Sequence, residues 1–262
     1  MGGITSTPAP TLRRFNNVVY QYASVTSTNE VARELAETGA GEGTTVVAEE
    51  QTTGRGRLGR AWLSPKGEGL YHSIILRPDT SPSGVPVLTL MAAVALAEFV
   101  REQYQLMVDI KWPNDVLIRQ WKFAGILAEA EVKRDHLDYV ILGIGINLNQ
   151  TSFSPDIAAQ ATSIKLETGQ PSDPDGTRQK LYVKLDTWYD RFLKQGAAEI
   201  IRRWCELSSY AEGKSVKVIT GDRTITGVTC GLTPAGSLIV ETPTGERETI
   251  LTGEVQSLRK KE

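Results

Sequence analysis

The sequence predicts an α+β fold in which a large domain precedes a small all-β domain. Short apolar segments gather in the middle of the chain with helical patterns on either side, an order that favours α+β over a doubly wound sheet. Beyond residue 214 the pattern changes to short β segments separated by glycine turns. We therefore expect a flexible N-terminus over 1–16, a main domain over 17–208 and a β domain over 209–262.

The first half of the main domain alternates strand and helix patterns. A β-rich segment over 18–25 is followed by Ser27, which with Glu30 predicts a capping box at the start of a helix. Gly39 is expected to end this helix. Further along, we expect strands over 44–49 and 69–76 and a strongly apolar helix over 86–104.

The second half of the main domain is richer in strands. Short apolar runs are separated by polar turns, so we expect antiparallel hairpins over 106–111, 115–119, 122–132 and 137–148. Apolar residues at helical spacing predict one helix over 177–192 and another after Gly196. The β domain is expected to contain strands over 215–219, 223–229, 237–241 and 246–251.

The composition argues against several classes of protein. A net charge of -2 and a pI near 5.9 give no reason to expect nucleic acid or an anionic membrane as a partner. Cys205 and Cys230 are too few for a disulfide framework or a zinc site. We find neither a signal-peptide pattern nor an apolar run long enough to cross a bilayer, so we expect a cytoplasmic protein without membrane contact.

Residues 51–60 form a segment that we call the arginine loop. Its three arginines, Arg55, Arg57 and Arg60, are interspersed with glycines, so that backbone N–H groups and guanidinium groups can surround an anion. Residues 54–59 also fit the dinucleotide pattern GxGxxG, but no helical pattern follows, and we reject that interpretation. A solvated basic turn is the alternative.

A second cationic segment contains Lys111, Asn114, Asp115 and Lys122. Together with the arginine loop it offers what phosphate chemistry needs: fixed positive charge and a carboxylate that can hold a divalent metal ion. Taken alone, the segment 111–115 could equally be an ordinary turn, and Lys122 could be an exposed lysine at the edge of a sheet.

Glycines recur in the apolar strands near these cations. Gly125 follows Lys122, and Gly143 and Gly145 precede Asn147. Glycine within a strand lets a ligand or another backbone approach closely. These strands therefore suit either the floor of a pocket or a tight crossing of the sheet.

Five motifs in this order resemble the biotin protein ligases. They are Ser-Thr-Asn at 27–29, the arginine loop with 62–65, the segment 111–115, the segment 122–127 and the segment 143–147. The resemblance covers roughly 18–260. It implies a class II aminoacyl-tRNA synthetase-like catalytic domain with a mixed sheet over 17–208, followed by an SH3-like β domain. It also implies that ATP, with Mg²⁺, activates biotin, which is then transferred to a lysine of the biotin carboxyl carrier domain of a biotin-dependent carboxylase.

The resemblance assigns expected roles to the matching residues. Those expected to act in catalysis are Lys122, Arg57, Lys111 and Asp115. Those expected to bind biotin are Ser27, Thr28, Asn29, Gln51, Arg55, Gly56, Arg57, Lys122, Gly125 and Gly143, with Trp62 and Gly145 beside its apolar chain. Those expected to bind ATP are Arg57, Arg60, Asn114, Asp115, Lys122 and Asn147. Asp115 is the candidate magnesium ligand, or it orients Lys122; the sequence leaves both open.

Longer members of this family carry an N-terminal winged helix-turn-helix and repress transcription. Residues 1–17 precede the first expected strand and are too few for three helices, so we expect neither DNA binding nor repression. A homodimer is a further possibility that the sequence leaves open.

Three alternatives compete with a biotin ligase. A lipoate or octanoyl ligase would share the scaffold, but the arginine loop resembles the biotin branch. A nucleic-acid-binding module is disfavoured by the acidic net charge and by the lack of interleaved aromatic residues. An inactive scaffold is disfavoured because Arg57, Lys111 and Lys122 are all present.

Overall fold

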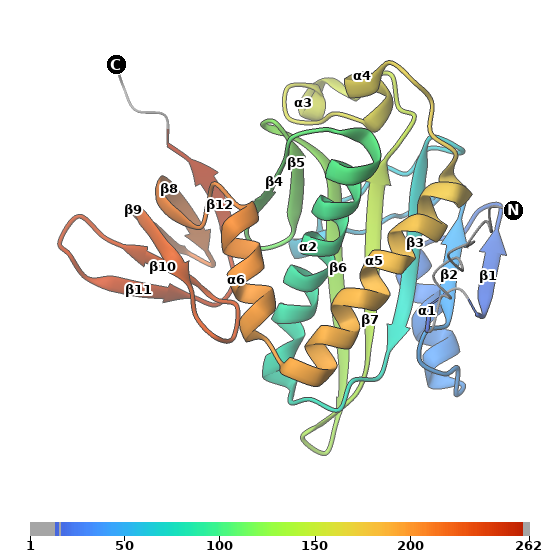
Figure 1. The fold of residues 1–262 in the computed structure, drawn as a ribbon, viewed down its shortest axis with the longest axis horizontal. Helices are drawn as coiled ribbons and strands as arrows, with labels where there is room; N and C mark the ends of the chain where they lie inside the picture. The colour runs from blue at the N-terminus through green and yellow to red at the C-terminus, as the bar shows by residue number, and fades with distance from the viewer. Residues whose placement is uncertain (1–13, 16, 259–262) are drawn as a thin grey trace, which may run out of the picture.

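A seven-stranded mixed sheet forms the centre of the main domain (Figure 1), with the order β1-β2-β3-β7-β6-β5-β4. The computed structural model describes residues 14, 15 and 17–258, so most of the predicted flexible segment 1–16 lies outside the described residues. Strands β1 and β2 pair in parallel and the remaining neighbours pair antiparallel. The strands are β1 (Val19–Tyr22), β2 (Thr45–Ala48), β3 (Gly69–Leu76), β4 (Val108–Lys111), β5 (Asp115–Ile118), β6 (Trp121–Lys133) and β7 (His136–Asn147).

Three long helices cover one face of this sheet and α1 covers part of the other (Figure 1). The helices are α1 (Thr28–Glu37), α2 (Val85–Tyr104), α5 (Pro174–Gln195) and α6 (Ala198–Leu207). The apolar side chains of α2, α5 and α6 form the main core with the sheet. On the opposite face, Ala32 and Ala36 of α1 pack with Val46 and Ile75 in a smaller core. This mixed sheet with separate helices confirms the predicted α+β class.

Alternation along the strands assigns side chains to the two faces of the sheet, because successive residues point to opposite sides. Ile74 of β3 joins the main core beneath the long helices, whereas its neighbour Ile75 packs with α1. Ser73 shares the α1 side with Ile75, and it pairs across the sheet with Gly143. In the same way Gly125 of β6 pairs with Gly145 of β7. The glycines of β6 and β7 therefore lie on the face that the long helices leave free.

The expectation that no apolar run is long enough to cross a bilayer is wrong for the segment that contains helix α2. By length and hydropathy alone, Pro82–Tyr104 is apolar enough to cross a membrane. In the structure 67% of its most apolar window is buried, between the sheet and the helices α5 and α6. The hydropathy of this segment is thus accounted for by its place in the protein core.

The capping box predicted for α1 is wrong. Ser27 is the N-cap residue, but its side chain makes no capping hydrogen bond. Glu30 instead accepts a hydrogen bond from Thr26 Oγ1 at 2.6 Å and forms an ion pair with Arg55. A hydrogen bond from Thr26 and an ion pair with the arginine loop have taken the place of the capping box.

The C-terminal part forms a five-stranded antiparallel sheet with the order β11-β10-β9-β8-β12. Its strands are β8 (Glu212–Thr220), β9 (Arg223–Leu232), β10 (Leu238–Glu241), β11 (Arg247–Ile250) and β12 (Glu254–Ser257). The sequence analysis did not predict β12, nor the two short helices α3 (Pro155–Ala158) and α4 (Ile164–Thr168). Two 3-10 turns, η1 (Arg57–Gly59) and η2 (Pro82–Gly84), complete the described elements.

Hydrogen bonds join the β domain and the connection that leads into it to the edge of the central sheet. Trp112 Nε1, just after β4, donates to the carbonyl oxygen of Gly236 at 2.9 Å. In the connection between α6 and β8, Ser208 Oγ donates to the carbonyl oxygen of Ile110, and Ser209 Oγ donates to Asp109. The β domain is therefore held beside β4, close to the second cationic segment.

Candidate active site

A cavity of about 640 Å³ lies on the free face of the central sheet, between the arginine loop and the β domain. Every residue that the sequence analysis named for catalysis, biotin or ATP lines it: Ser27, Thr28, Asn29, Gln51, Arg55, Gly56, Arg57, Arg60, Lys111, Asn114, Asp115, Lys122, Gly125, Gly143 and Asn147. Residues up to 120 positions apart are thus brought to one place, although their individual roles stay predictions.

Glycines give the cavity a smooth floor. The side chain of Trp62 lies directly over Gly125 and Gly145: a Cβ atom built on Gly145 would fall 2.4 Å from Trp62 Nε1, and one on Gly125 would fall 3.2 Å from its ring. A Cβ atom on Gly143 would fall 2.1 Å from Asn29 Oδ1. These positions therefore need glycine because other side chains lie flat on the sheet there.

Substitution Gly143→Ala is expected to weaken biotin binding and to lower the free energy of unfolding by about 1–3 kcal/mol, because the new methyl group overlaps Asn29. Chemical denaturation and a biotin titration measure the two effects. Gly41→Ala is the matched control, since no heavy atom lies within 4 Å of its added Cβ atom. Unchanged biotin affinity in folded Gly143→Ala would contradict this account of the floor.

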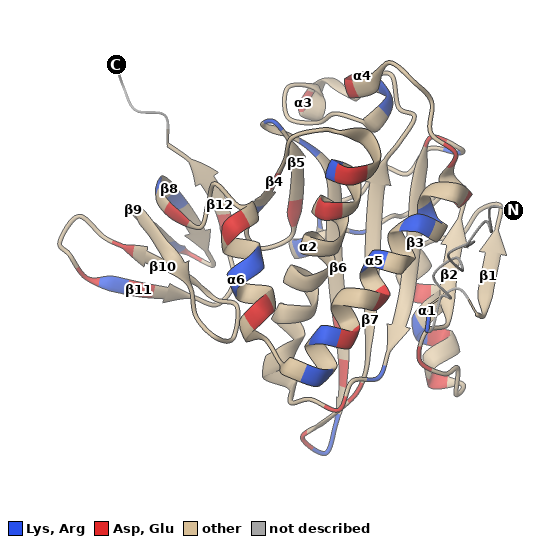
Figure 2. Ribbon diagram, in the orientation of Figure 1, with Lys and Arg blue, Asp and Glu red and all other residues tan. Residues whose placement is uncertain are grey.

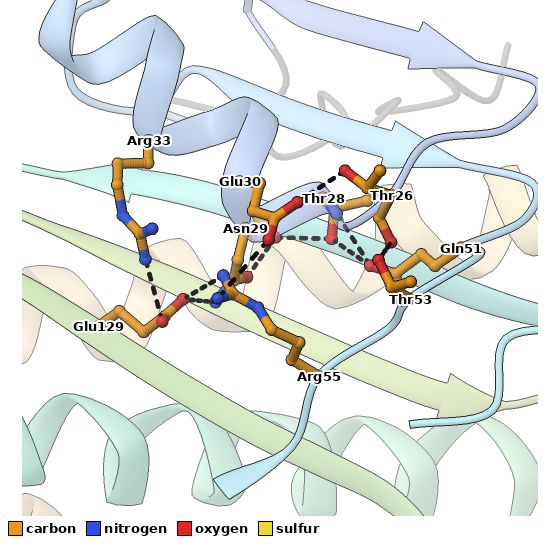
Figure 3. Close-up of polar contacts among 10 residues, drawn as sticks. Thr26, Thr28, Asn29, Glu30, Arg33, Gln51, Thr53, Arg55 and Glu129 are labelled. Atoms are coloured by element: carbon orange, nitrogen blue, oxygen red, sulfur yellow. Dashed lines mark hydrogen bonds and ion pairs between the residues drawn. The ribbon is translucent and has the colours of Figure 1, made fainter. Parts of the chain in front are cut away.

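A chain of hydrogen bonds forms one end of the cavity (Figure 3). Gln51 Oε1 accepts from the backbone N–H of Thr28 at 2.9 Å and from its hydroxyl at 3.1 Å. Gln51 Nε2 donates to Ser64 Oγ at 2.8 Å. Ser73 Oγ donates to Asn29 Oδ1 at 2.6 Å and lies 2.8 Å from Thr28 Oγ1. This end presents ordered amides and hydroxyls, which suits a ligand ring that both donates and accepts hydrogen bonds.

The other end of the cavity is cationic. Lys122 Nζ lies 2.6 Å from Asp115 Oδ1 and 5.3 Å from the centre of the Trp62 ring. The backbone of Lys122 is paired as well: its N–H donates to Gln160, and its carbonyl oxygen accepts from the N–H of Thr162. Of the two roles left open for Asp115, the geometry favours orienting Lys122.

Lys111 contributes a second amine beside the β domain. Its Nζ lies 6.0 Å from the centre of the Tyr210 ring. Burial lowers the pKa of Lys111, while the carboxylates of Asp115 and Glu254 act in the opposite direction. An anionic ligand would add to these carboxylates and favour the protonated amine.

The three arginines of the loop have different partners. Arg55 forms ion pairs with Glu30 and Glu129 at 3.6 Å and 3.5 Å. Arg60 pairs with Glu254 of β12, and this hydrogen bond raises the pKa of Arg60.

Arg57 contacts neutral groups. It donates to Thr252 Oγ1 at 2.8 Å and to the carbonyl oxygen of Gly253 at 3.3 Å. Burial lowers its pKa. Within the described part of the chain Arg57 forms no ion pair with a carboxylate, so an anionic ligand need not displace one.

The two predicted asparagines have structural partners. Asn114 Nδ2 donates to the carbonyl oxygen of Ile126 at 3.0 Å, and Asn147 Nδ2 donates to that of Thr162 at 3.0 Å. Asn114 thus fixes the turn between β4 and β5 to β6, and Asn147 fixes the end of β7 to the segment before α4.

The donor set for magnesium is small. Among the described residues no group of three His, Cys, Asp or Glu side chains is arranged to hold a metal ion. Mg²⁺ commonly uses one or two carboxylates and completes its shell with water and substrate phosphates. Asp115 could therefore supply one carboxylate to a Mg²⁺ ion that enters together with ATP, and the phosphates and water would supply the other ligands.

Several lining or supporting residues escaped the sequence analysis. They are Glu129, Gln160, Tyr210, Thr252, Gly253 and Glu254. Glu129 had a usable signal, since it lies an even number of residues after Gly125 on a strand and therefore on the same face. The contacts of 252–254 depend on how the β domain docks, which no local pattern reveals.

Comparison with known proteins identifies the family. Residues 22–147 match the Biotin/lipoate A/B protein ligase family, and residues 213–257 match the Biotin protein ligase C terminal domain. The biotin–(acetyl-CoA-carboxylase) ligase of Paracoccus denitrificans is 32% identical over 238 residues, which span 89% of this chain and 98% of that protein. The chain belongs to the biotin protein ligases.

Other biotin protein ligases agree with this assignment. The bifunctional ligase/repressor BirA of Bacillus subtilis is 39% identical over 223 residues, 84% of this chain and 68% of that protein. The structure of a biotin protein ligase from Aquifex aeolicus in complex with biotin and ATP superposes with a TM-score of 0.80 at 32% identity, covering 93% of this chain and 99% of that one. The fold predicted for a biotin protein ligase, with its C-terminal β domain, is thereby confirmed.

Proposed function

We propose that the cavity is where this biotin protein ligase converts biotin and ATP into biotinyl-5′-AMP and then transfers biotin to a lysine of a carrier protein. One observation supports the proposal most strongly. The polar side chains around Thr28 and the cations Lys122, Lys111 and Arg57 line the same cavity. The polar end suits the ureido ring of biotin, the glycine floor suits its apolar chain, and the cations suit its carboxylate.

In the first step an oxygen of the biotin carboxylate attacks the α-phosphorus of ATP. A new P–O bond forms and pyrophosphate leaves with the electron pair of the bond that breaks. Both reactants are anions, and two unit charges 4 Å apart repel by about 4 kcal/mol at an effective dielectric constant of 20. Lys122 and Arg57 offset this repulsion, and fixed cations do so without reorganising during the reaction. Positioning of the two reactants supplies much of the remaining rate enhancement.

Asp115 holds the amine of Lys122 in place at the cavity through their 2.6 Å contact. Arg60 and Lys111 are proposed to bind the phosphates of ATP, with Glu254 released from Arg60 as the nucleotide enters. Mg²⁺, when bound, would neutralise phosphate charge and would be held mainly by ATP and water, because Asp115 is engaged by Lys122.

In the second step the neutral ε-amine of the carrier lysine attacks the carbonyl carbon of the adenylate. A C–N bond forms, the C–O bond to phosphate breaks, AMP leaves with the electron pair of that bond, and the nitrogen gives up one proton to solvent. The same cations stabilise the leaving phosphate. The partner we propose is the biotin carboxyl carrier domain of a biotin-dependent carboxylase.

The decisive experiment incubates the protein with ATP, magnesium and either biotin or lipoate, and then detects the acyl-adenylate by mass spectrometry. We expect biotinyl-5′-AMP and no lipoyl-AMP. Octanoate serves as a third acid, because an octanoyl ligase would share the scaffold. Adenylate from lipoate or octanoate but not from biotin would overturn the proposed substrate.

A nucleic-acid-binding role has less support. Figure 2 shows acidic and basic residues alternating along α5 and α6 rather than separating into one basic face. Two of the three loop arginines already pair with carboxylates, which leaves little local charge for phosphates of a polyanion.

A further inference from the structure

Glu129 lies where the arginine loop, α1 and the central sheet meet (Figure 3). It is on β6, and its side chain is only 28% exposed. It lies outside the motifs that carry the resemblance to the family. Along a strand that rises about 3.3 Å per residue, Glu129 is roughly 20 Å from Lys122, so it is remote from the proposed adenylation chemistry.

One contact of Glu129 fixes the amide of Asn29. Its Oε2 accepts from Asn29 Nδ2 at 2.6 Å, while Asn29 Oδ1 accepts from Ser73 at 2.6 Å. The carboxylate can only accept this bond, so it determines which way the amide is turned. Asn29 is 4% exposed and lines the polar end of the cavity, over Gly143.

The other contacts fix the middle of the arginine loop, at Arg55. Arg55 Nη2 lies 3.5 Å from Glu129 Oε2, and Arg55 Nη1 lies 3.6 Å from Glu30 Oε1. Arg33 of α1 holds the second oxygen of Glu129 at 3.0 Å. The guanidinium group of Arg55 is therefore held between two carboxylates (Figure 3), which places the loop backbone at Gly56 beside the cavity.

We propose that Glu129 is a positioning residue for biotin recognition. It acts through Asn29 and Arg55, which border the polar end, and takes no part in the transfer of the phosphoryl or biotinyl group. The inference rests on the proposed function, because it assumes that the ring of biotin occupies this end of the cavity. Its consequence is a separation of roles: Glu129 controls the affinity for biotin, and Lys122 controls the rate of adenylation.

The test is Glu129→Gln, which keeps the shape of the side chain and removes its charge. In biotin-dependent ATP–pyrophosphate exchange we expect the KM for biotin to rise about 10- to 100-fold, the effect of losing hydrogen bonds to a charged group. The KM for ATP and kcat at saturating biotin should be retained. Glu131→Gln is the matched control, because it removes the same charge from the same strand, and Glu131 forms no ion pair within the described residues.

A reciprocal exchange tests the route through Asn29. Asn29→Asp alone places a second carboxylate against Glu129 and should weaken biotin binding. The double variant Asn29→Asp with Glu129→Gln restores the hydrogen bond with donor and acceptor swapped, and should bind biotin more tightly than Asn29→Asp. Direct biotin titration of these variants, with their thermal unfolding midpoints, separates binding from folding.

The outcomes are distinguishable. If the wild-type protein shows no biotin-dependent exchange, the proposed function itself fails. If the wild type is active and Glu129→Gln keeps its KM for biotin, with or without a lower unfolding midpoint, Glu129 is only structural and the inference is overturned. A lower kcat at unchanged KM, or no recovery in the reciprocal exchange, also overturns it.

Discussion

Lys122→Ala is expected to slow the formation of biotinyl-5′-AMP by about 100- to 1,000-fold, the cost of removing one preorganised group that stabilises developing charge. Single-turnover adenylation with radiolabelled ATP measures this step directly. The variant should remain folded, because the amine is partly exposed and its loss leaves Asp115 in contact with solvent.

Lys133→Ala is the matched control for this prediction. Lys133 lies on the same strand, and its ion pair with Asp138 is likewise 2.6 Å long, but it does not line the cavity. Near-normal adenylation in folded Lys122→Ala would remove Lys122 from the mechanism.

Arg57→Ala is expected to shorten the lifetime of bound biotinyl-5′-AMP by about 10- to 100-fold, since a hydrogen bond from a charged group to the phosphate is lost and such losses act mainly on dissociation rates. The adenylate should then escape and acylate lysines of unrelated proteins. Release of radiolabelled adenylate from a gel-filtered complex measures the lifetime.

Proteolysis reports on the same loop. Because Arg57 contacts only neutral groups of the β domain, its contacts can be exchanged for an anion, and we expect biotin to slow cleavage between Gln51 and Arg60. Arg223→Ala on β9 is the control, since Arg223 is exposed and pairs with Glu248 away from the cavity. Equal cleavage with and without biotin, together with a normal adenylate lifetime in Arg57→Ala, would show that the loop is not a ligand-dependent lid.

The motifs located the cavity because its residues are concentrated in five short segments. Short apolar runs between polar turns then correctly located the strands that carry them, and β3 was predicted with its observed bounds. The network of Thr28 with Gln51 also joins two of these motifs. The motifs do not reveal the residues that hold their side chains in place. Glu129 contacts Asn29, which is 100 positions away in the sequence, and no local pattern indicates that pairing.

The errors have a common physical cause. Ser27 and Glu30 have the spacing of a capping box, but Glu30 instead accepts a hydrogen bond from its near neighbour Thr26 and forms an ion pair with Arg55 of the loop. Strand β12 is short and exists because β8 offers it an edge. In both cases the short sequence pattern omits a partner outside it: Thr26 and Arg55 for Glu30, and β8 for β12.

The contact of Trp112 with Gly236 of the β domain has a consequence for stability. Trp112 is 3% exposed, and the main core continues from the central sheet into Val216 and Leu238 of the β domain, so separating the β domain from β4 would expose this apolar surface to water. The two sheets accordingly act as one cooperative unit, and denaturation is expected to proceed in a single transition rather than one domain at a time.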